Sequence, residues 1–153
     1  MSYKNQTTRT IALRFADNFA PEPGTILIHS NLIKENGYVW YGKLGNPISQ
    51  RVIEDLLSQK SPRILLIHSG RADRYWAKVE YIQREQPCLD EIPFYYRAQA
   101  KKFRTWFKLT NIEAAEPDVM LKCKVASSGD MLSNVSKHSL SPYFIIDYSG
   151  TLL

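Results

Sequence analysis

The chain has 153 residues, a mass of 17.7 kDa and a formal net charge of +5 at pH 7. This length fits one domain, and a content of 44% hydrophobic and 23% charged residues excludes a chain that is disordered over most of its length. No apolar run approaches the roughly 20 residues of a membrane-spanning helix, and the polar residues 1–9 are unlike a signal peptide. We therefore expect a cytoplasmic protein without a membrane partner, with a flexible polar tail over residues 1–9 and a single domain over residues 10–153.

Two strands and one helix are predicted in the first part of the chain. Apolar residues with high strand propensity occupy residues 11–15 and 25–29, and a turn rich in proline separates them at residues 21–24. A helix is predicted over residues 46–57, because Asn46 can cap it, a proline follows, and the next apolar residues keep helical spacing.

The remainder of the chain is predicted to be mostly strand. Residues 64–67 and 76–82 form apolar runs around a polar turn, and residues 119–125 alternate between apolar and polar side chains, as a strand with one buried face does. A last strand is predicted over residues 143–147. This pattern favours an α+β fold, with a curved β-sheet or partly open barrel of six to seven strands flanked by one or more helices.

Charged and aromatic residues are concentrated in one stretch of the chain. Residues 63–108 contain ten cations and five anions, so this stretch carries the entire net charge of +5. The same stretch contains nine aromatic residues. Lys and Arg side chains meet phosphates and flat rings stack on bases, so the combination indicates a nucleic-acid partner. The alternative is an aromatic core beneath a solvated charged surface.

Motifs for catalysis and metal binding are incomplete. Residues 37–44 nearly match a phosphate-binding P-loop, but Leu44 stands where a Ser or Thr hydroxyl is needed. His29 and Ser30 are neighbours on a predicted strand, where adjacent side chains point to opposite faces, so they do not form a nucleophilic pair. The two cysteines stand far apart in the sequence. We therefore predict no catalytic residues, no cofactor and no metal site, and expect that the chain is not an enzyme.

Several segments, taken in chain order, resemble YTH domains. The matching segments are residues 26–31, 37–41, 64–82, 106–112 and 127–132. The resemblance covers most of residues 25–147 and is similarly close to EVE domains, which belong with YTH domains to the PUA-like group. Residues 37–43, with the later Ile-Pro-x-Tyr-Tyr-Arg at residues 92–97, are most similar to the modules fused to McrB-type methyl-directed restriction GTPases.

The resemblance implies a PUA-like fold that holds a flipped, modified base in an aromatic cage. A methylated base is more apolar than its parent and gains from enclosure by rings, while nearby polar groups read its edge. Trp40 matches the first cage tryptophan, and the second wall is expected from Tyr95 or Tyr96. The implied base-binding residues are Ser30, Asn31, Trp40, Tyr41, Tyr95, Tyr96 and Trp106. The implied phosphate-binding residues are Lys43, Arg71, Arg74, Arg97, Lys101 and Lys102.

The implied function is recognition of modified DNA by base flipping, with 6-methyladenine or 5-methylcytosine as the mark. The chain would be the specificity module of a type IV, McrBC-like restriction system, with a GTPase motor on the same polypeptide and a nuclease as partner. Two alternatives stay open. One is a reader of 6-methyladenine in RNA, since RNA is a possible partner as well, and the other is a nuclease similar to ASCH domains.

Overall fold

The computed structural model describes residues 7–18 and 20–150 and divides them into two compact units. Unit 1 draws on the chain up to residue 15, on residues 64–76 and on the chain from residue 114 onward, and unit 2 comprises residues 16–63 and 77–113. Seven strands of the described residues pair in the order β2-β5-β4-β3-β1-β7-β6, with both parallel and antiparallel neighbours. The predicted α+β fold is confirmed.

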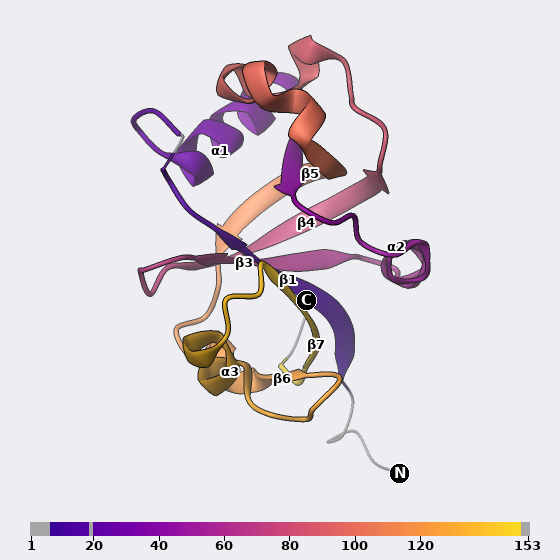
Figure 1. Ribbon diagram of the computed structural model, residues 1–153, viewed down its shortest axis with the longest axis vertical. Helices are drawn as coiled ribbons and strands as arrows, with labels where there is room; N and C mark the ends of the chain where they lie inside the picture. Colours follow the sequence, from indigo (N-terminus) through magenta and orange to yellow (C-terminus); the bar gives the residue numbers. More distant parts are fainter. Residues whose placement is uncertain (1–6, 19, 151–153) are drawn as a thin grey trace. The chain divides into compact units, whose positions relative to one another are not determined.

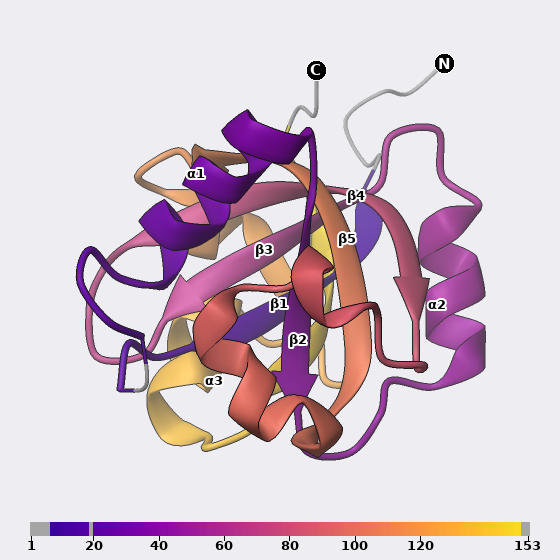
Figure 2. The ribbon, with the colours of Figure 1, turned by 90° about the horizontal axis from the view of Figure 1, so that it is seen from above.

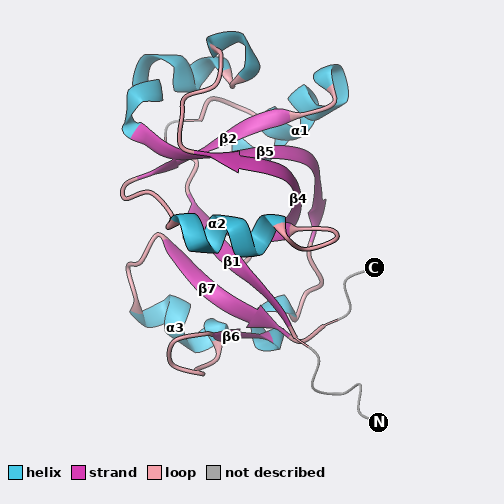
Figure 3. Ribbon diagram, turned by 90° about the vertical axis from the view of Figure 1, so that its right-hand side faces the viewer, coloured by secondary structure: helices cyan, strands magenta, loops and turns pink. Residues whose placement is uncertain are grey.

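Unit 1 is built around strand β1. Its elements are β1 (Thr8–Phe15), β3 (Arg63–His68), η3 (Val119–Lys122), β6 (Cys123–Val125), α3 (Leu132–His138) and β7 (Tyr143–Tyr148). Strand β1 pairs in parallel with β3 and antiparallel with β7, and β6 extends the sheet beyond β7. Figure 3 shows α3 beside β6, and the two elements are in contact. The carboxylate of Glu116 ties this unit together by accepting from Trp76 Nε1 at 3.0 Å, from Lys122 Nζ at 3.3 Å and from the Tyr148 hydroxyl.

Unit 2 contains a three-stranded part of the sheet with helices around β2. Its elements are α1 (Thr25–Asn36), β2 (Val39–Leu44), α2 (Gln50–Leu57), β4 (Arg74–Gln83), η1 (Leu89–Glu91), η2 (Phe94–Lys102) and β5 (Phe103–Ala114), with the first residues of β4 belonging to unit 1. Strand β2 pairs antiparallel with β5. Figure 1 shows α1 and the red-orange η2 gathered near β5, and both helices contact β2.

The prediction of a strand over residues 25–29 is wrong, because these residues begin helix α1. Thr25 and His29, four residues apart, are the buried positions of this segment, which is helical and not strand spacing. The Thr25 amide donates to the Asp17 carboxylate at 3.0 Å, and Gly37 ends the helix at a φ of 87°, where its N–H donates to the carbonyl of Ile33.

Two further predictions need correction. Only Cys123–Val125 of the alternating segment is strand, since the adjacent Val119 and Met120 are both buried, which a strand with one wet face does not allow. The predicted helix is present as α2, but its N-cap is Ser49, whose side chain accepts from the Val52 amide at 3.3 Å.

The remaining strand predictions are confirmed by β1, β3, β4 and β7. Strand β1 begins at Thr8, so Thr8 and Arg9 belong to the sheet and the predicted tail is too long by these two residues. Residues 1–6 of that tail lie outside the described residues. No helix within residues 7–18 and 20–150 is both long enough and apolar enough to cross a membrane.

Candidate nucleic-acid interface

An aromatic cluster in unit 2 brings together most of the predicted base-binding residues. The aromatic cluster consists of Trp40, Ile92, Tyr96, Ala100 and Trp106, with Tyr38, Tyr95 and Phe103 partly buried against it. These residues come from β2, β5, η2 and the segments beside them. The cluster therefore joins segments that are more than 60 residues apart in the sequence.

The strand register explains how Trp40 and Trp106 meet. Trp40 pairs with Lys108 and Gly42 pairs with Trp106 across β2 and β5, which places both tryptophans on one face of this strand pair. Gly42 is required by the close approach of the rings, because a Cβ at this position would lie 2.7 Å from Cγ of Phe103 and 3.0 Å from Cζ3 of Trp106.

Tyr96 lies at the centre of the ring contacts. Its ring centroid is 4.5 Å from that of Phe103, 4.8 Å from that of Tyr95 and 6.0 Å from that of Trp106. On another side it lies 5.5 Å from the ring of His29, which also contacts Tyr41 at 5.3 Å. Helix η2, which carries Tyr96, crosses in front of β2 in Figure 2.

Three buried ring nitrogens of this region have no hydrogen-bond partner among the described residues. They are Nε1 of Trp40, Nε1 of Trp106 and Nε2 of His29. Trp40 is 6% exposed and Trp106 is fully buried. A buried donor or acceptor that lacks a partner costs about 1–3 kcal/mol, so these atoms destabilise a purely structural core and suit a site where a ligand supplies the partner.

The protonation state of His29 follows from its surroundings. Its Nδ1 lies 2.8 Å from the carbonyl oxygen of Thr25, which can only accept, so Nδ1 carries the hydrogen. Burial lowers the pKa of His29 from 6.5 to about 4. At neutral pH the ring is therefore uncharged, and its Nε2 presents a lone pair. The aromatic cluster thus offers two indole N–H donors, and the neighbouring His29 offers one imidazole acceptor.

The two buried tyrosine hydroxyls of this region remain protonated. Burial is the main cause that raises the pKa of Tyr41 and of Tyr96 well above the ordinary value of 10. Both hydroxyls can therefore donate as well as accept at neutral pH.

A basic segment, residues 97–104, follows the cluster in the chain. Arg97, Lys101, Lys102 and Arg104 are all exposed, and no acidic side chain interrupts them. Tyr96 and Ala100 of the same helix are buried, so η2 carries aromatic contacts on its inner side and cations on its outer side. Arg97 is held in place by donation from Nε to the Leu89 carbonyl at 3.0 Å.

Other predicted site residues lie elsewhere. Ser30 and Asn31 are on helix α1, which begins in the segment predicted as a strand. Lys43 is 6% exposed, and its Nζ donates to the carbonyls of Leu44 and Asn46 at 3.1 and 2.9 Å. Burial also lowers the pKa of Lys43. Lys43 therefore supports the turn after β2, and its phosphate contact stays a prediction.

Two of the predicted phosphate contacts belong to unit 1. Arg71 is exposed in the turn between β3 and β4, and Arg74 is partly buried. Nη1 of Arg74 lies 3.5 Å from the Arg71 carbonyl, and burial lowers the pKa of its guanidinium. The interface formed by the aromatic cluster and the basic segment consists of unit 2 residues alone.

One group of side chains has the composition of a metal site. Ligand atoms of Cys88, Asp90 and Glu91 lie within 4.8 Å of one another. Hydrogen bonding to Glu91 is the main cause that raises the pKa of the Cys88 thiol. Glu91 also accepts from the Tyr38 hydroxyl. We assign no metal to this exposed group.

Three residues of the site were missed by sequence reasoning. His29 lies in the segment predicted as a strand, Ala100 lies in η2, for which the sequence predicts no helix, and Gly42 carries no local turn signal. His29 stands one helical turn after Thr25, in a segment that ends at Gly37. This spacing is the signal that could have indicated a helix.

Most of the chain matches a known protein family. No curated protein and no solved structure matches the chain. The family model described as Pua-like matches residues 11–144, which is most of the chain and includes the whole aromatic cluster and the basic segment. The chain therefore belongs to the Pua-like family.

Proposed function

We propose that this chain is a non-enzymatic recognition domain that binds nucleic acid and holds a methylated base at the aromatic cluster. Pua-like domains generally bind nucleic acids. The observation that carries the proposal is a set of three unpartnered ring nitrogens, two in the aromatic cluster and one on His29, whose ring contacts Tyr96 of the cluster. The exposed cations of the basic segment on the outer side of η2 support it.

The donors and the acceptor of the cluster match the chemistry of a base edge. Adenine and cytosine each present an exocyclic amine beside ring nitrogen or oxygen acceptors. The indole N–H groups of Trp40 and Trp106 would donate to the acceptors, and Nε2 of His29 would accept from the amine. The surrounding rings would stack on the base and enclose its methyl group. Because the methylated base is more apolar than its parent, it would bind more tightly.

A base reaches the cluster only if η2 moves, because the residues that it contributes close over the rings. Helix η2 is a 3₁₀ helix of nine residues, whereas such helices rarely exceed three to four residues because their hydrogen bonds are poorly aligned. Such a helix is easier to displace than an α-helix of equal length. Displacement would withdraw Tyr96 from the ring contacts and leave its position to the base.

The nucleic acid in this proposal is DNA, bound within a type IV, McrBC-like restriction system. The support is the similarity of residues 37–43 and 92–97 to the modules of McrB-type GTPases. The motor would lie on the same polypeptide and the nuclease on a partner. The chemistry of the aromatic cluster does not depend on the choice of DNA or of the restriction system. It suits a methylated base in RNA equally well.

A panel of matched oligonucleotides tests the proposal. The panel contains DNA and RNA strands with 6-methyladenine, 5-methylcytosine, 5-hydroxymethylcytosine or no mark. We expect tighter binding of one methylated DNA than of its unmarked counterpart, without cleavage. Equal affinities across the panel contradict a methyl reader, tighter binding of methylated RNA replaces the DNA assignment, and cleavage of the strands contradicts the non-enzymatic assignment.

The substitution Trp40→Phe tests the position of the base. Phenylalanine keeps an aromatic ring and removes the indole N–H, so we expect binding of the methylated strand to weaken by about 1 kcal/mol, or roughly fivefold. The matched control is Trp76→Phe, because Trp76 belongs to unit 1 and its indole donates to Glu116. Equal losses of affinity in the two variants, or no loss in Trp40→Phe, would show that the base does not contact the indole of Trp40.

A further inference from the structure

The segment over residues 89–102, called the cover below, lies over the aromatic cluster and contains the helices η1 and η2. Nε of Arg97 in η2 donates to the carbonyl of Leu89 in η1 at 3.0 Å, which holds the two helices together. Ile92 and Tyr96 place the inner side of the cover within the cluster. The cover can therefore be treated as one piece that closes over the rings.

The two ends of the cover are held differently. Helix η2 ends at Lys102 and β5 begins at the next residue, so the chain itself fixes this end to the sheet. The other end follows residues 84–88, which form neither helix nor strand. There, Glu91 of η1 accepts a hydrogen bond from the hydroxyl of Tyr38, which stands directly before β2. This bond is the main cause that raises the pKa of Tyr38, so the hydroxyl keeps its proton at neutral pH.

Tyr38 is itself fixed to the sheet. Its ring is partly buried against the aromatic cluster, and Nζ of Lys108 lies 4.5 Å from the ring centroid. Lys108 in β5 also forms an ion pair with Glu80 in β4, with 3.2 Å between Nζ and Oε1. A connected series of contacts therefore leads from β4 and β5 through Tyr38 to Glu91 in the cover.

We propose that the hydrogen bond between Tyr38 and Glu91 is a latch that holds the cover closed over the aromatic cluster and limits access to its rings. The regulatory role rests on the proposed function, in which a base reaches the cluster only if η2 moves. When the bond breaks, the end of the cover at η1 is released, and the cover can turn about the junction of η2 with β5. The indoles of Trp40 and Trp106 then become accessible to water or to a base.

Hydrogen exchange of the indole N–H groups in the free protein tests the latch. Tyr38→Phe removes the donor and keeps the ring. We therefore expect the indoles of Trp40 and Trp106 to exchange about tenfold faster, the effect of one hydrogen bond to a charged group. The indole of Trp76, in unit 1, should exchange as in the unaltered chain. Unchanged exchange at Trp40 and Trp106, or an equal increase at all three indoles, overturns the latch.

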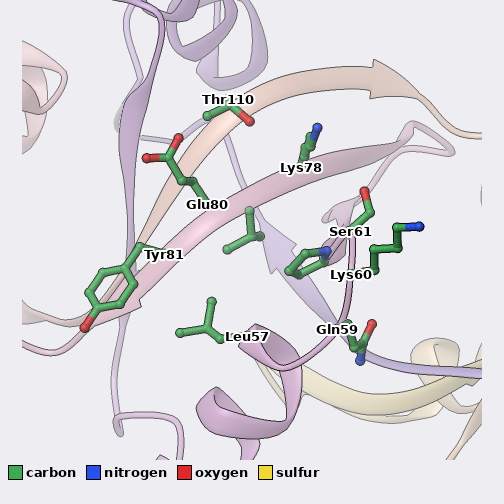
Figure 4. Close-up of a pocket in the computed structure, with 10 residues that line it drawn as sticks. Leu57, Gln59, Lys60, Ser61, Lys78, Glu80, Tyr81 and Thr110 are labelled. Atoms are coloured by element: carbon green, nitrogen blue, oxygen red, sulfur yellow. The ribbon is translucent and has the colours of Figure 1, made fainter.

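The matched control is Tyr81→Phe, which removes the hydroxyl of a tyrosine that is 51% exposed. Figure 4 shows Tyr81 and Glu80, which border a hollow beside β4, on opposite sides of the strand. Glu80 is paired with Lys108 on the side of the latch, so Tyr81 lies on the other side. Tyr81→Phe should leave indole exchange unchanged. Equally fast exchange in Tyr81→Phe and Tyr38→Phe contradicts the latch.

A second pair of variants changes the acceptor. Glu91→Gln replaces the charged acceptor of the latch with a neutral one, and Asp90→Asn removes the same charge from the neighbouring exposed residue of η1. We expect faster indole exchange in Glu91→Gln and little change in Asp90→Asn. The double variant with Tyr38→Phe should exchange about as fast as Tyr38→Phe alone, because both substitutions act on one bond. Additive effects, or equal effects of Glu91→Gln and Asp90→Asn, contradict the latch.

Binding of oligonucleotides separates this inference from the proposed function. If both hold, Tyr38→Phe should bind the methylated strand about tenfold more tightly, because a larger fraction of the molecules is open. Faster indole exchange without a preference for the methylated strand supports the latch and contradicts the methyl reader. A preference for the methylated strand without faster exchange supports the reader and contradicts the latch. Faster exchange with unchanged affinity contradicts the control of base entry by the latch.

Discussion

At the scale of single residues, the candidate site depends on buried polar atoms without partners. Nε1 of Trp40 and Nε1 of Trp106 are buried in the aromatic cluster, and Nε2 of His29 is buried on a ring that contacts Tyr96. A core selected for stability alone avoids such atoms, because each buried polar atom without a partner costs about 1–3 kcal/mol of folding free energy. These atoms distinguish the cluster from an ordinary aromatic core, which composition alone does not do.

The stability of the chain should depend on pH through His29. Its pKa is about 4 in the folded chain and 6.5 ordinarily, so the unfolded chain binds the proton more tightly. The stability that the neutral ring supports is present above pH 6.5 and is lost as the pH falls toward 4. We expect a loss of roughly 2 kcal/mol between pH 7 and pH 5, measured by urea unfolding. His29→Gln should reduce this pH dependence. The control is His138→Gln, at an exposed position, which should retain it. Equal pH dependence in the two variants contradicts the role of His29.

Gly42 should not tolerate a side chain. A Cβ at this position would overlap Phe103, so Gly42→Ala should destabilise the chain by about 1–3 kcal/mol. The cost should fall when Phe103 is also changed to alanine, because that variant removes the overlapping ring. Urea unfolding of the two single variants and the double variant gives the coupling. Strictly additive costs would show that the two residues do not meet.

At the scale of elements, η2 combines a buried aromatic side with an exposed basic side. The cations of that side should contact phosphates, which carry no information on the base. Replacing Lys101 and Lys102 with glutamine should therefore weaken binding of methylated and unmarked DNA equally. On duplex DNA it should also reduce the slope of log K against log salt by about 0.9 for each phosphate that the variant no longer neutralises. Lys34→Gln, at the exposed end of α1, is the control. If replacement of Lys101 and Lys102 weakens binding of methylated DNA alone, their role as phosphate contacts is contradicted.

The elements that could be predicted from the sequence are those with a clear period or length. Strands β1, β3, β4 and β7 are short apolar runs between turns, and α2 keeps helical spacing. Helix α1 was missed because its first five residues are mostly apolar and β-branched, a composition that suits a strand equally well. Helix η2 was missed because its burial depends on β2, which comes from a distant part of the sequence.

At the scale of the whole molecule, the net charge is distributed over both units and is not confined to one of them. The stretch that carries the entire +5 charge is divided between the units, since residues 64–76 belong to unit 1 and residues 77–108 to unit 2. Within unit 2 the uninterrupted cations are those of residues 97–104. The placement of Trp40 and Trp106 on one face of β2 and β5 likewise depends on the register of the two strands, which the sequence does not reveal.

The three indole N–H signals of the chain, one from each tryptophan, report directly on whether a base enters the aromatic cluster. Trp40 and Trp106 have unpartnered indoles in the aromatic cluster, whereas the indole of Trp76 already donates to Glu116. Titration with a methylated oligonucleotide, followed by nuclear magnetic resonance, should shift the signals of Trp40 and Trp106 strongly and that of Trp76 little. The unmarked oligonucleotide should shift them less. Binding of the methylated strand that leaves the signals of Trp40 and Trp106 unchanged would contradict a base at the aromatic cluster.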